Sequence, residues 1–213
     1  MQSVLIFLSS WYYLYAQVIY LKPMADKKLK DREEEIILLV RDAKLGNTDA
    51  FAKLYDYYVN PIYRYVYYKV NREDALDITE SIFLKIWENL KSYRKIKGTF
   101  SSWVFKIAHN LIVDHYRLQR QYIPIDDLNL PDEKRESDPS ARAQEALDQE
   151  NLKRALSQLK KKYQQIILLR YVNDLELSEI AKIMKKSEGS LRVLKFRALQ
   201  ALRKVFESMN ITY

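Results

Sequence analysis

Apolar residues recur at steps of three and four along most of this chain, and that spacing places them on one face of an α-helix. Ile36, Ile37, Leu39 and Val40 form one such stripe. No segment shows the sustained alternation of apolar and polar residues that is expected of a half-buried β-strand. The pattern therefore predicts an all-α protein. Its predicted helices cover 33–44, a segment from residue 50, a further segment from residue 61, 74–90, 101–120, a segment from about 140, 152–159, 163–171, 178–184 and 188–209.

Several helix boundaries are marked by particular residues. Asn47, Thr48 and Asp49 offer N-caps for the helix that starts at Ala50. Pro61 is expected at the first position of a new helix, where its missing N–H is harmless. The many tyrosines around it are expected to pack on amphipathic faces with their hydroxyls at the surface.

One segment interrupts the helical pattern. Between residues 122 and 148 the sequence carries three prolines, few large apolar residues and many acids. The net charge is −5 over 121–149, against +4 over 24–120 and +8 over 150–213. Two basic blocks joined by an acidic segment indicate two domains that meet polyanions. The predicted organisation is an apolar extension at 1–23, a helical domain at 24–121, an acidic flexible linker at 122–149 and a second helical domain at 150–208 that contains a helix-turn-helix.

The first 23 residues differ from the rest, because residues 4–21 carry no charge. Their length is marginal for a membrane span, and two serines, Gln17 and four tyrosines weaken that interpretation. A signal peptide is not expected, because no basic region precedes the apolar run and no small-residue cleavage site follows it. Three interpretations stay open: translation that starts at Met24, a membrane anchor, or a helix for a partner. The first is favoured, because Met24 is followed by a charged stretch typical of a solvated N-terminus.

Composition excludes several classes of site. The chain has no cysteine, so disulfides, thiolate zinc sites, iron–sulfur clusters and cysteine nucleophiles are excluded. Its two histidines, His109 and His115, are too few for a histidine-rich metal site. Three glycines are too few for a glycine-rich phosphate cradle. The sequence thus predicts no catalytic residue, no metal and no cofactor, and the protein is not expected to be an enzyme.

The C-terminal block predicts a helix-turn-helix between residues 175 and 204. Ser178 and Ser187 are N-cap candidates for two helices separated by a tight turn at Lys185 and Lys186. A recognition helix reads DNA with the residues of its first turns. Arg192 and Arg197 carry donors for guanine or phosphate. Phe196 is a large apolar residue on a face otherwise free to be polar, where it can pack against a thymine methyl.

The run GSLRVLKFRALQALR resembles the −35-reading helix of sigma-70 family factors, in particular the compact extracytoplasmic-function type. The preceding run ALSQLKKKYQQIILLRY is similar to the helices before it. A small polar residue is frequent in the family where Val193 stands, so the promoter sequence that is read is expected to differ. The residues expected to bind the −35 element are Ser187, Glu188, Ser190, Arg192, Val193, Phe196 and Arg197.

The run GTFSSWVFKIAHNLIVDHYR resembles the family's −10 recognition and melting segment. Aromatic residues interleaved with bases suit a single strand, because rings stack on bases while cations hold phosphates. Phe100 and Trp103 are alternatively core anchors, and the buried stripe is expected to hold Val104, Ile107, Ala108, Leu111, His115 and Leu118. The residues expected to bind and melt the −10 element are Lys95, Lys97, Phe100, Trp103, Lys106, Asn110, Val113 and Arg117.

The run DALDITESIFLKIWENL resembles the family's main core-polymerase-binding helix. Its outer face sets an exposed leucine among acids, which indicates a protein partner with basic flanks rather than DNA. The alternative, an ordinary solvated acidic face, explains the acids but not the leucine. The residues expected to bind core polymerase are Asp77, Glu80, Ser81, Leu84 and Glu88.

The resemblance implies a cytoplasmic sigma factor that directs polymerase to −35 and −10 elements and opens the duplex. Its expected partners are core RNA polymerase, through the clamp region and the upstream-promoter-facing surface, double-stranded and melted promoter DNA, and in some members an anti-sigma factor. A membrane partner is not expected. Two alternatives stay open: a helix-turn-helix regulator that acts without core polymerase, and a nuclease using Asp77, Glu80 and Asp114.

Overall fold

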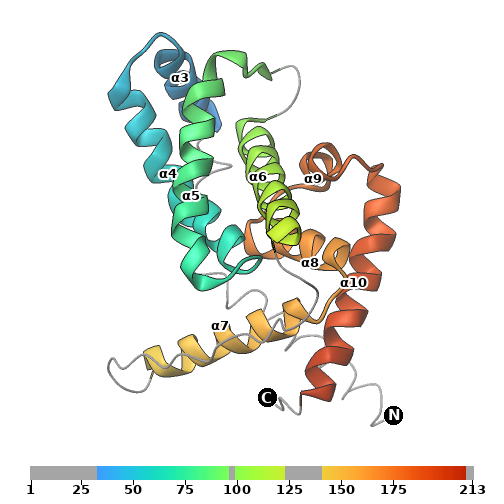
Figure 1. The fold of residues 1–213 in the computed structure, drawn as a ribbon. Coiled ribbons are helices and arrows are strands. Elements are labelled where there is room, and N and C mark those ends of the chain that lie inside the picture. Colours follow the sequence, from blue (N-terminus) through green and yellow to red (C-terminus); the bar gives the residue numbers. More distant parts are fainter. Residues whose placement is uncertain (1–32, 96–98, 123–140, 210–213) are drawn as a thin grey trace. The chain divides into compact units, whose positions relative to one another are not determined.

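The computed structural model describes residues 33–95, 99–122 and 141–209 (Figure 1). Within these ranges all regular structure is helical, which confirms the predicted all-α class. In chain order the elements are α3 (Glu33–Lys44), α4 (Thr48–Tyr67), α5 (Arg72–Asn89), the short 3-10 helix η1 (Leu90–Ser92), α6 (Phe100–Tyr122), α7 (Ala141–Ser157), α8 (Lys161–Ile167), the π-helical turn η3 (Leu168–Val172), α9 (Leu177–Met184) and α10 (Glu188–Ser208).

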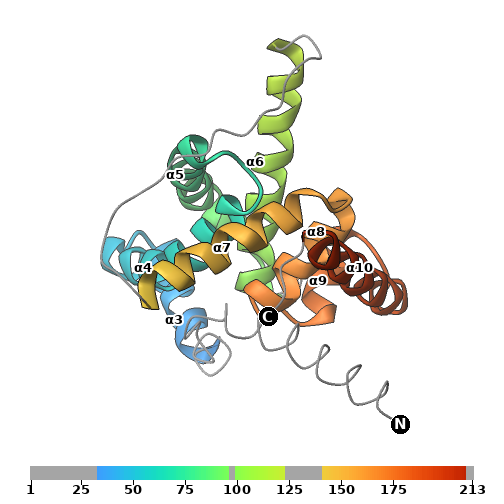
Figure 2. The ribbon, with the colours of Figure 1, turned by 90° about the horizontal axis from the view of Figure 1, so that it is seen from below.

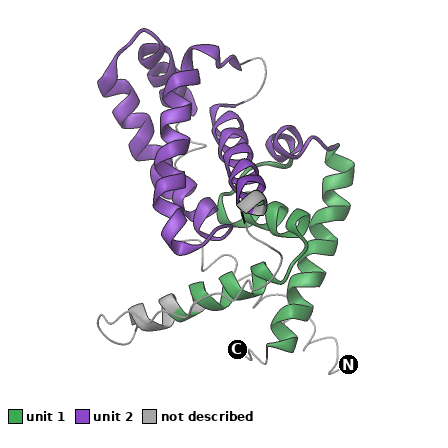
Figure 3. Cartoon of the chain, viewed as in Figure 1, with its two compact units in different colours: residues 1–25, 136–177, 187–213 green, residues 26–135, 178–186 purple. Residues whose placement is uncertain are grey.

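The described helices fall into two compact units (Figure 3). Unit 1 contains α7, α8, η3 and α10, and unit 2 contains α3, α4, α5, η1, α6 and α9. The predicted acidic linker lies mostly at 123–140, outside the described residues, as does the apolar segment 1–23. The final part of the predicted linker, from residue 141, is already helical in α7.

Unit 2 is built on α4, α5 and α6, whose apolar faces meet in one core. α4 packs against α3, α5 and α6, and α5 packs against α6 (Figures 1 and 2). Ile62 and Tyr65 of α4, Ile82 of α5, and Phe105 and Ile112 of α6 are almost completely buried. Each such side chain stabilises the fold by roughly 1.5–3 kcal/mol relative to an exposed one. This core fixes which faces of α5 and α6 remain outside.

α4 is one 20-residue helix with Pro61 inside it, so the prediction of a new helix at Pro61 was wrong. A proline inside a helix removes one backbone hydrogen bond and costs about 3 kcal/mol. Pro61 itself is buried, as are Tyr58 and Ile62 beside it. Burial of this apolar stripe on both sides of the proline offsets the lost bond. The predicted N-cap at the start of the helix is confirmed, because Asn47 Oδ1 accepts from the Ala50 N–H at 3.1 Å.

The tyrosines of α4 are more deeply buried than the sequence suggested. Tyr58 is enclosed completely, and its hydroxyl lies 2.9 Å from the Ser101 hydroxyl of α6. Burial raises the pKa of Tyr58 far above its ordinary value, and the Ser101 hydrogen bond partly counters the effect. The Tyr65 hydroxyl accepts from Lys69 Nζ at 3.4 Å. These hydroxyls therefore pair inside the domain instead of facing water.

The buried face of α6 is rotated from the predicted stripe. Val104 and Ala108 are buried as expected, but Phe105 and Ile112 complete the core face. Leu118 is 59% exposed, so its assignment to the core was wrong. The predicted stripe followed the most apolar line on the helical wheel, whereas the core of unit 2 needs the large ring of Phe105 against Tyr65, with ring centroids 5.5 Å apart.

Unit 1 is held together by a second core. α10 packs against α8 and α7 (Figure 2). Leu156 of α7, Ile166 of α8 and Leu168 of η3 have no exposed surface, and Leu191 and Leu202 of α10 are buried with them. The buried leucines of α10 leave the opposite face of that helix outside.

A pH-dependent loss of stability is expected from His109 of α6. Burial lowers the pKa of His109 to about 4, and the nearby Lys69 cation contributes in the same direction. In the unfolded chain this imidazole has its ordinary pKa of about 6.5. Between about pH 6.5 and about pH 4 only the unfolded chain takes up the proton, so the free energy of unfolding falls as pH falls through this window. The full stabilisation is present above pH 6.5.

Urea unfolding at about pH 7.5 and about pH 5 measures this effect. We expect His109 to lower the free energy of unfolding by about 1 kcal/mol between these two pH values. This is less than the full pKa difference would give, because the ring is partly exposed. His109→Gln carries no titrating ring and should show a smaller pH dependence. An identical pH dependence in the variant and the unmodified protein would contradict the assignment.

Candidate DNA and polymerase interfaces

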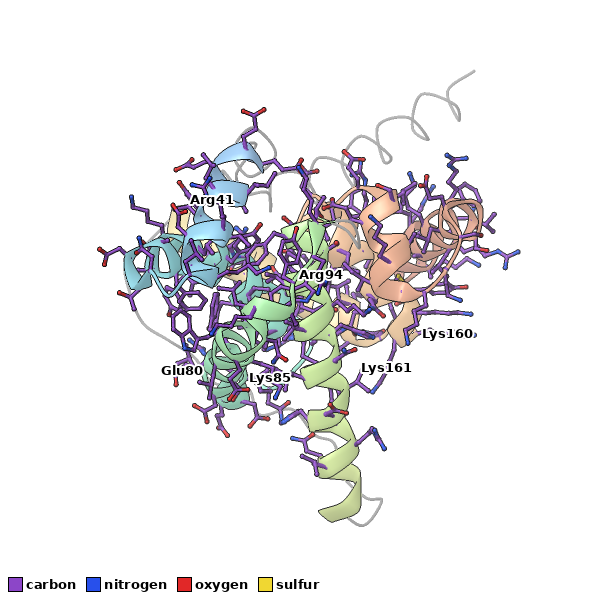
Figure 4. All side chains as sticks on the ribbon, turned by 90° about the horizontal axis from the view of Figure 1, so that it is seen from above. Arg41, Glu80, Lys85, Arg94, Lys160 and Lys161 are labelled. Carbon is purple, nitrogen blue, oxygen red and sulfur yellow. The ribbon has the colours of Figure 1, made fainter. Side chains whose placement is uncertain are left out.

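The outer face of α5 sets an apolar side chain among acids. Ile78, Ile82 and Ile86 turn into the core, which leaves the predicted residues on the opposite side. Leu84 is 61% exposed, and Glu80 projects from the same helix (Figure 4). Asp77, Ser81 and Glu88 are exposed as well. The structure thus brings all five predicted polymerase-binding residues onto one accessible face.

Sequence reasoning missed two apolar residues of this face. Leu76 is 60% exposed and Trp87 is about as exposed as Tyr55 on α4. The Trp87 and Phe51 rings pack in an edge-to-face arrangement, with centroids 4.6 Å apart, so α4 holds the indole while 40% of the Trp87 surface stays exposed. Leu76 lies eight residues before Leu84, which returns it to within about 80° on the helical wheel. That spacing was the signal that could have found it.

The charge of this face is predominantly negative. Its one cation, Lys85, forms an ion pair with Glu88 at 3.2 Å, at the edge of the face. Both side chains are half exposed, so the pair contributes little to stability. Asp77 and Glu80 form no ion pair within the described residues. Their carboxylates therefore leave a negative potential around Leu84, which suits a basic protein surface.

The start of α6 shows which predicted aromatic residue is accessible. Phe100 is 4% exposed, and its ring packs against Tyr58 and Tyr93 with centroids 5.4 and 5.2 Å away. It is the core anchor that the sequence offered as the alternative, and its ring cannot reach a base without leaving the core. The Trp103 ring packs against Tyr93 at a tilt, with centroids 5.4 Å apart, and Trp103 remains partly exposed.

The exposed face of α6 carries the other predicted −10 residues. Lys106, Asn110, Val113 and Arg117 are all exposed and follow one another at steps of three or four. They therefore form one line along the helix. Arg117 pairs with Asp114 at 3.6 Å on the surface. Lys95 is exposed just before the helix, while Lys97 lies outside the described residues.

The start of α10 is fixed by its predicted cap. The Ser187 hydroxyl accepts from the Ser190 N–H at 3.3 Å and donates to the Ser190 hydroxyl at 3.0 Å. Glu188 follows in the first turn and pairs with Arg192 at 3.8 Å. The long distance and the exposure of both side chains make this a weak pair that a stronger anion can replace.

The outer face of α10 carries apolar and cationic side chains together. Val193 and Phe196 are each 51% exposed, although α10 already buries a full apolar stripe on its other side. Arg192 and Arg197 are exposed around them. A face with two large apolar residues between arginines resembles a surface that meets DNA base edges and phosphates more than a solvated one.

Two further properties of the described part of the chain concern metal ligands and apolar helices. No three side chains among its histidines and acids converge as metal ligands. His115 instead lies 3.3 Å from Asp74 of α5, as one pair. No helix within these ranges is both long and apolar enough to span a bilayer.

Two protein-family models match the chain. Sigma-70 region 2 matches residues 54–122, and sigma-70 region 4 matches residues 149–202. The sigma factor SigV of Bacillus subtilis is 30% identical over 136 residues, which are 64% of this chain and 78% of SigV. The chain belongs to the sigma-70 family of sigma factors. Its relatives include sigma factors that are named as the extracytoplasmic-function type, and members of the family are transcription initiation factors rather than enzymes.

A second relative is a sigma factor as well, and a solved structure has a similar fold. The extracytoplasmic-function RNA polymerase sigma factor BldN of Streptomyces coelicolor is 31% identical over 169 residues. That match covers 78% of this chain but 64% of BldN, so the chain spans less than two thirds of that relative. The fold is similar to that of the sigma factor RpoE of Bartonella quintana, solved in complex with the anti-sigma factor NepR. The TM-score is 0.54 at 16% identity, over 84% of this chain and 98% of RpoE.

The two family matches contain the outer faces of α5, α6 and α10 described above. The region 2 match begins inside α4 and includes the outer faces of α5 and α6. The region 4 match includes α8, α9 and the first turns of α10. Each surface selected on exposure and charge therefore lies within a segment that the sigma family shares.

Proposed function

We propose that this sigma factor binds core RNA polymerase, directs it to promoter −35 and −10 elements and opens the duplex at the −10 element. One observation carries the proposal. The first turns of α10 expose Val193 and Phe196 beside Arg192 and Arg197, on a helix whose other face is fully used by the core. A recognition helix needs such a face, because apolar groups contact thymine methyls and guanidinium groups contact guanine or phosphate.

The outer face of α5 is the proposed polymerase contact. Leu84 supplies apolar area at its centre, and Asp77 and Glu80 surround it with negative charge. Leu76 and Trp87 enlarge the apolar area beyond the residues predicted from sequence. Buried apolar residues at the centre of an interface supply most binding energy, while the charged rim aligns the partners.

The exposed line of α6 is the proposed contact with the melted −10 strand. Lys106 and Arg117 hold phosphates, and Asn110 offers an amide to a base. Trp103 braces the start of the helix through Tyr93 and presents the rest of its ring to the strand. Phe100 supports this surface from the core rather than touching DNA.

The proposed role places the protein in the cytoplasm, where polymerase and promoter DNA are found. RpoE is bound by an anti-sigma factor. By analogy of fold, an anti-sigma factor that covers the α5 or α10 faces is a proposed partner of this chain too. The rival function, a regulator that binds DNA without polymerase, gains no support from the acidic, leucine-centred face of α5.

Opening of promoter DNA tests the proposal at the α6 surface. Permanganate oxidises unpaired thymines, so its reactivity around the −10 element reports melting by the polymerase that carries this chain. We expect Lys95→Ala combined with Lys106→Ala to slow the appearance of reactive thymines and to reduce the salt dependence of binding, because two phosphate contacts are lost. Lys53→Ala, an exposed lysine of α4, is the control. Opening that is unaltered at several salt concentrations would count against a melting role.

A further inference from the structure

The turn that follows α9 contains a lysine in a backbone conformation that favours glycine. α9 ends at Met184, and Lys185 has φ +52°. The N–H of Lys186 donates to the Ala181 carbonyl at 3.1 Å. The bond joins the second residue after the helix to a carbonyl five residues earlier. This pattern is the Schellman motif, in which the residue just after the helix adopts the left-handed conformation.

The same chain uses glycine for the same ending elsewhere. After α3, the Asn47 N–H donates to the Asp42 carbonyl at 3.2 Å, and Gly46 occupies the intermediate position with φ +95°. Glycine adopts this region without cost, whereas a side chain with a Cβ is strained there. Lys185 therefore holds a position where glycine would relax the turn, and a strained residue in a short turn points to a use for its side chain.

The chemistry of the turn indicates what that use is. Lys185 and its neighbours Lys182 and Lys186 are exposed, and none of the three forms an ion pair or side-chain hydrogen bond with the described residues. Ser187, the cap of α10, follows two residues after Lys185, so at most about 7 Å of backbone separate them. Lys185 thus lies in the short segment that leads directly into the first turns of α10, which are proposed to read DNA.

We propose that Lys185 binds a DNA phosphate beside the −35 element, and that the strained turn is kept because glycine would lose this cation. The inference rests on the proposed function and adds to it a contact that positions α10 without reading sequence. Because the ammonium meets a phosphate and no base edge, its contribution is expected to be equal on every −35 sequence.

The test uses the full chain assembled with core polymerase. The DNA probe is a promoter fragment selected from a random-sequence library by the unmodified assembly. Lys185→Gly removes strain and charge together, Lys185→Asn keeps a residue that tolerates the left-handed region but removes the charge, and Lys185→Arg keeps the charge. Lys204→Ala is the matched control, because it removes one exposed cation about 24 Å along α10 from its start.

We expect Lys185→Gly to leave the Tm of the chain unchanged or raise it by a few degrees. It should weaken DNA binding about threefold to tenfold and flatten the salt slope by about one unit, equally on all −35 variants. Lys185→Asn should weaken DNA binding as much as Lys185→Gly. Lys185→Arg and Lys204→Ala should bind DNA like the unmodified chain.

Three results would overturn the inference. They are a lower Tm for Lys185→Gly, unchanged DNA binding by both neutral variants, and a loss of the same size in Lys204→Ala. The same experiment distinguishes failure of the proposed function from failure of this inference. An assembly that selects no fragment defeats that function and this inference together, whereas normal selection with an unchanged Lys185→Gly defeats this inference alone.

Discussion

Leu84→Asp is expected to weaken binding of the chain to core RNA polymerase by about 1–3 kcal/mol, or roughly 5- to 150-fold. Leu84 is 61% exposed at the centre of the α5 face, so the change puts a charge where an apolar contact is expected while touching no core residue. Glu80→Lys should act in the same direction, because it reverses a charge of the surrounding acidic rim. Titration of labelled protein with purified core polymerase measures both.

Leu38→Asp is the matched control for this prediction. Leu38 is an exposed leucine on α3, outside the proposed face, and its replacement adds the same charge to the same unit. The free energy of unfolding should be nearly equal for the Leu84 and Leu38 variants, because both side chains face outward. Core binding that is unchanged in both Leu84→Asp and Glu80→Lys would remove the α5 face from the polymerase interface.

Arg192→Ala and Arg197→Ala are expected to weaken promoter binding in different ways. The two residues are five positions apart on α10, or about 140° around the helix, so they face different parts of the groove. Arg192 lies one turn into the helix, beside exposed Phe196, and is placed for a base edge. Arg197 lies towards the flank and is placed for a phosphate. Loss of Arg192 should cost about 1–3 kcal/mol on the correct −35 element and relax preference at one base pair.

Loss of Arg197 should instead weaken all sequences nearly equally and flatten the salt slope by about one unit. Binding of the polymerase assembly to a panel of −35 variants at two salt concentrations separates the two effects. Arg154→Ala, an exposed arginine of α7, controls for the loss of one positive charge. Equal loss of sequence preference in both α10 variants would refute the division of roles, and no loss in either would refute α10 as the reader.

The helices and the outer faces of α5 and α10 could be predicted because they depend on local spacing. The isoleucines of α5 recur every four residues, so their burial also defines where Leu84 and Glu80 must lie. The Ser187 cap likewise depends only on the residues next to it. Such features follow from the order of residues within one or two helical turns.

The errors arose where distant residues decide the outcome. Pro61 stays inside α4 because the packing of other helices against α4 buries it together with Tyr58 and Ile62, which no local signal reveals. Phe100 is enclosed by Tyr58 and Tyr93, from two other elements, so its burial could not be read from its own segment. Trp87 was missed because its partner Phe51 lies on α4. The strain at Lys185 comes from its positive φ, which cannot be predicted from the residue types alone.

Initiation of transcription by core polymerase is the most direct test of the account. Purified core polymerase transcribes a library of random upstream sequences joined to one reporter, with and without the full chain, and the transcripts are sequenced. The account predicts transcripts only with the chain, starting at a fixed distance from two shared elements, with loss of initiation in Leu84→Asp and altered choice of the upstream element in Arg192→Ala. Transcript yields equal to those of core polymerase alone, while the chain is folded and present in excess, would contradict it.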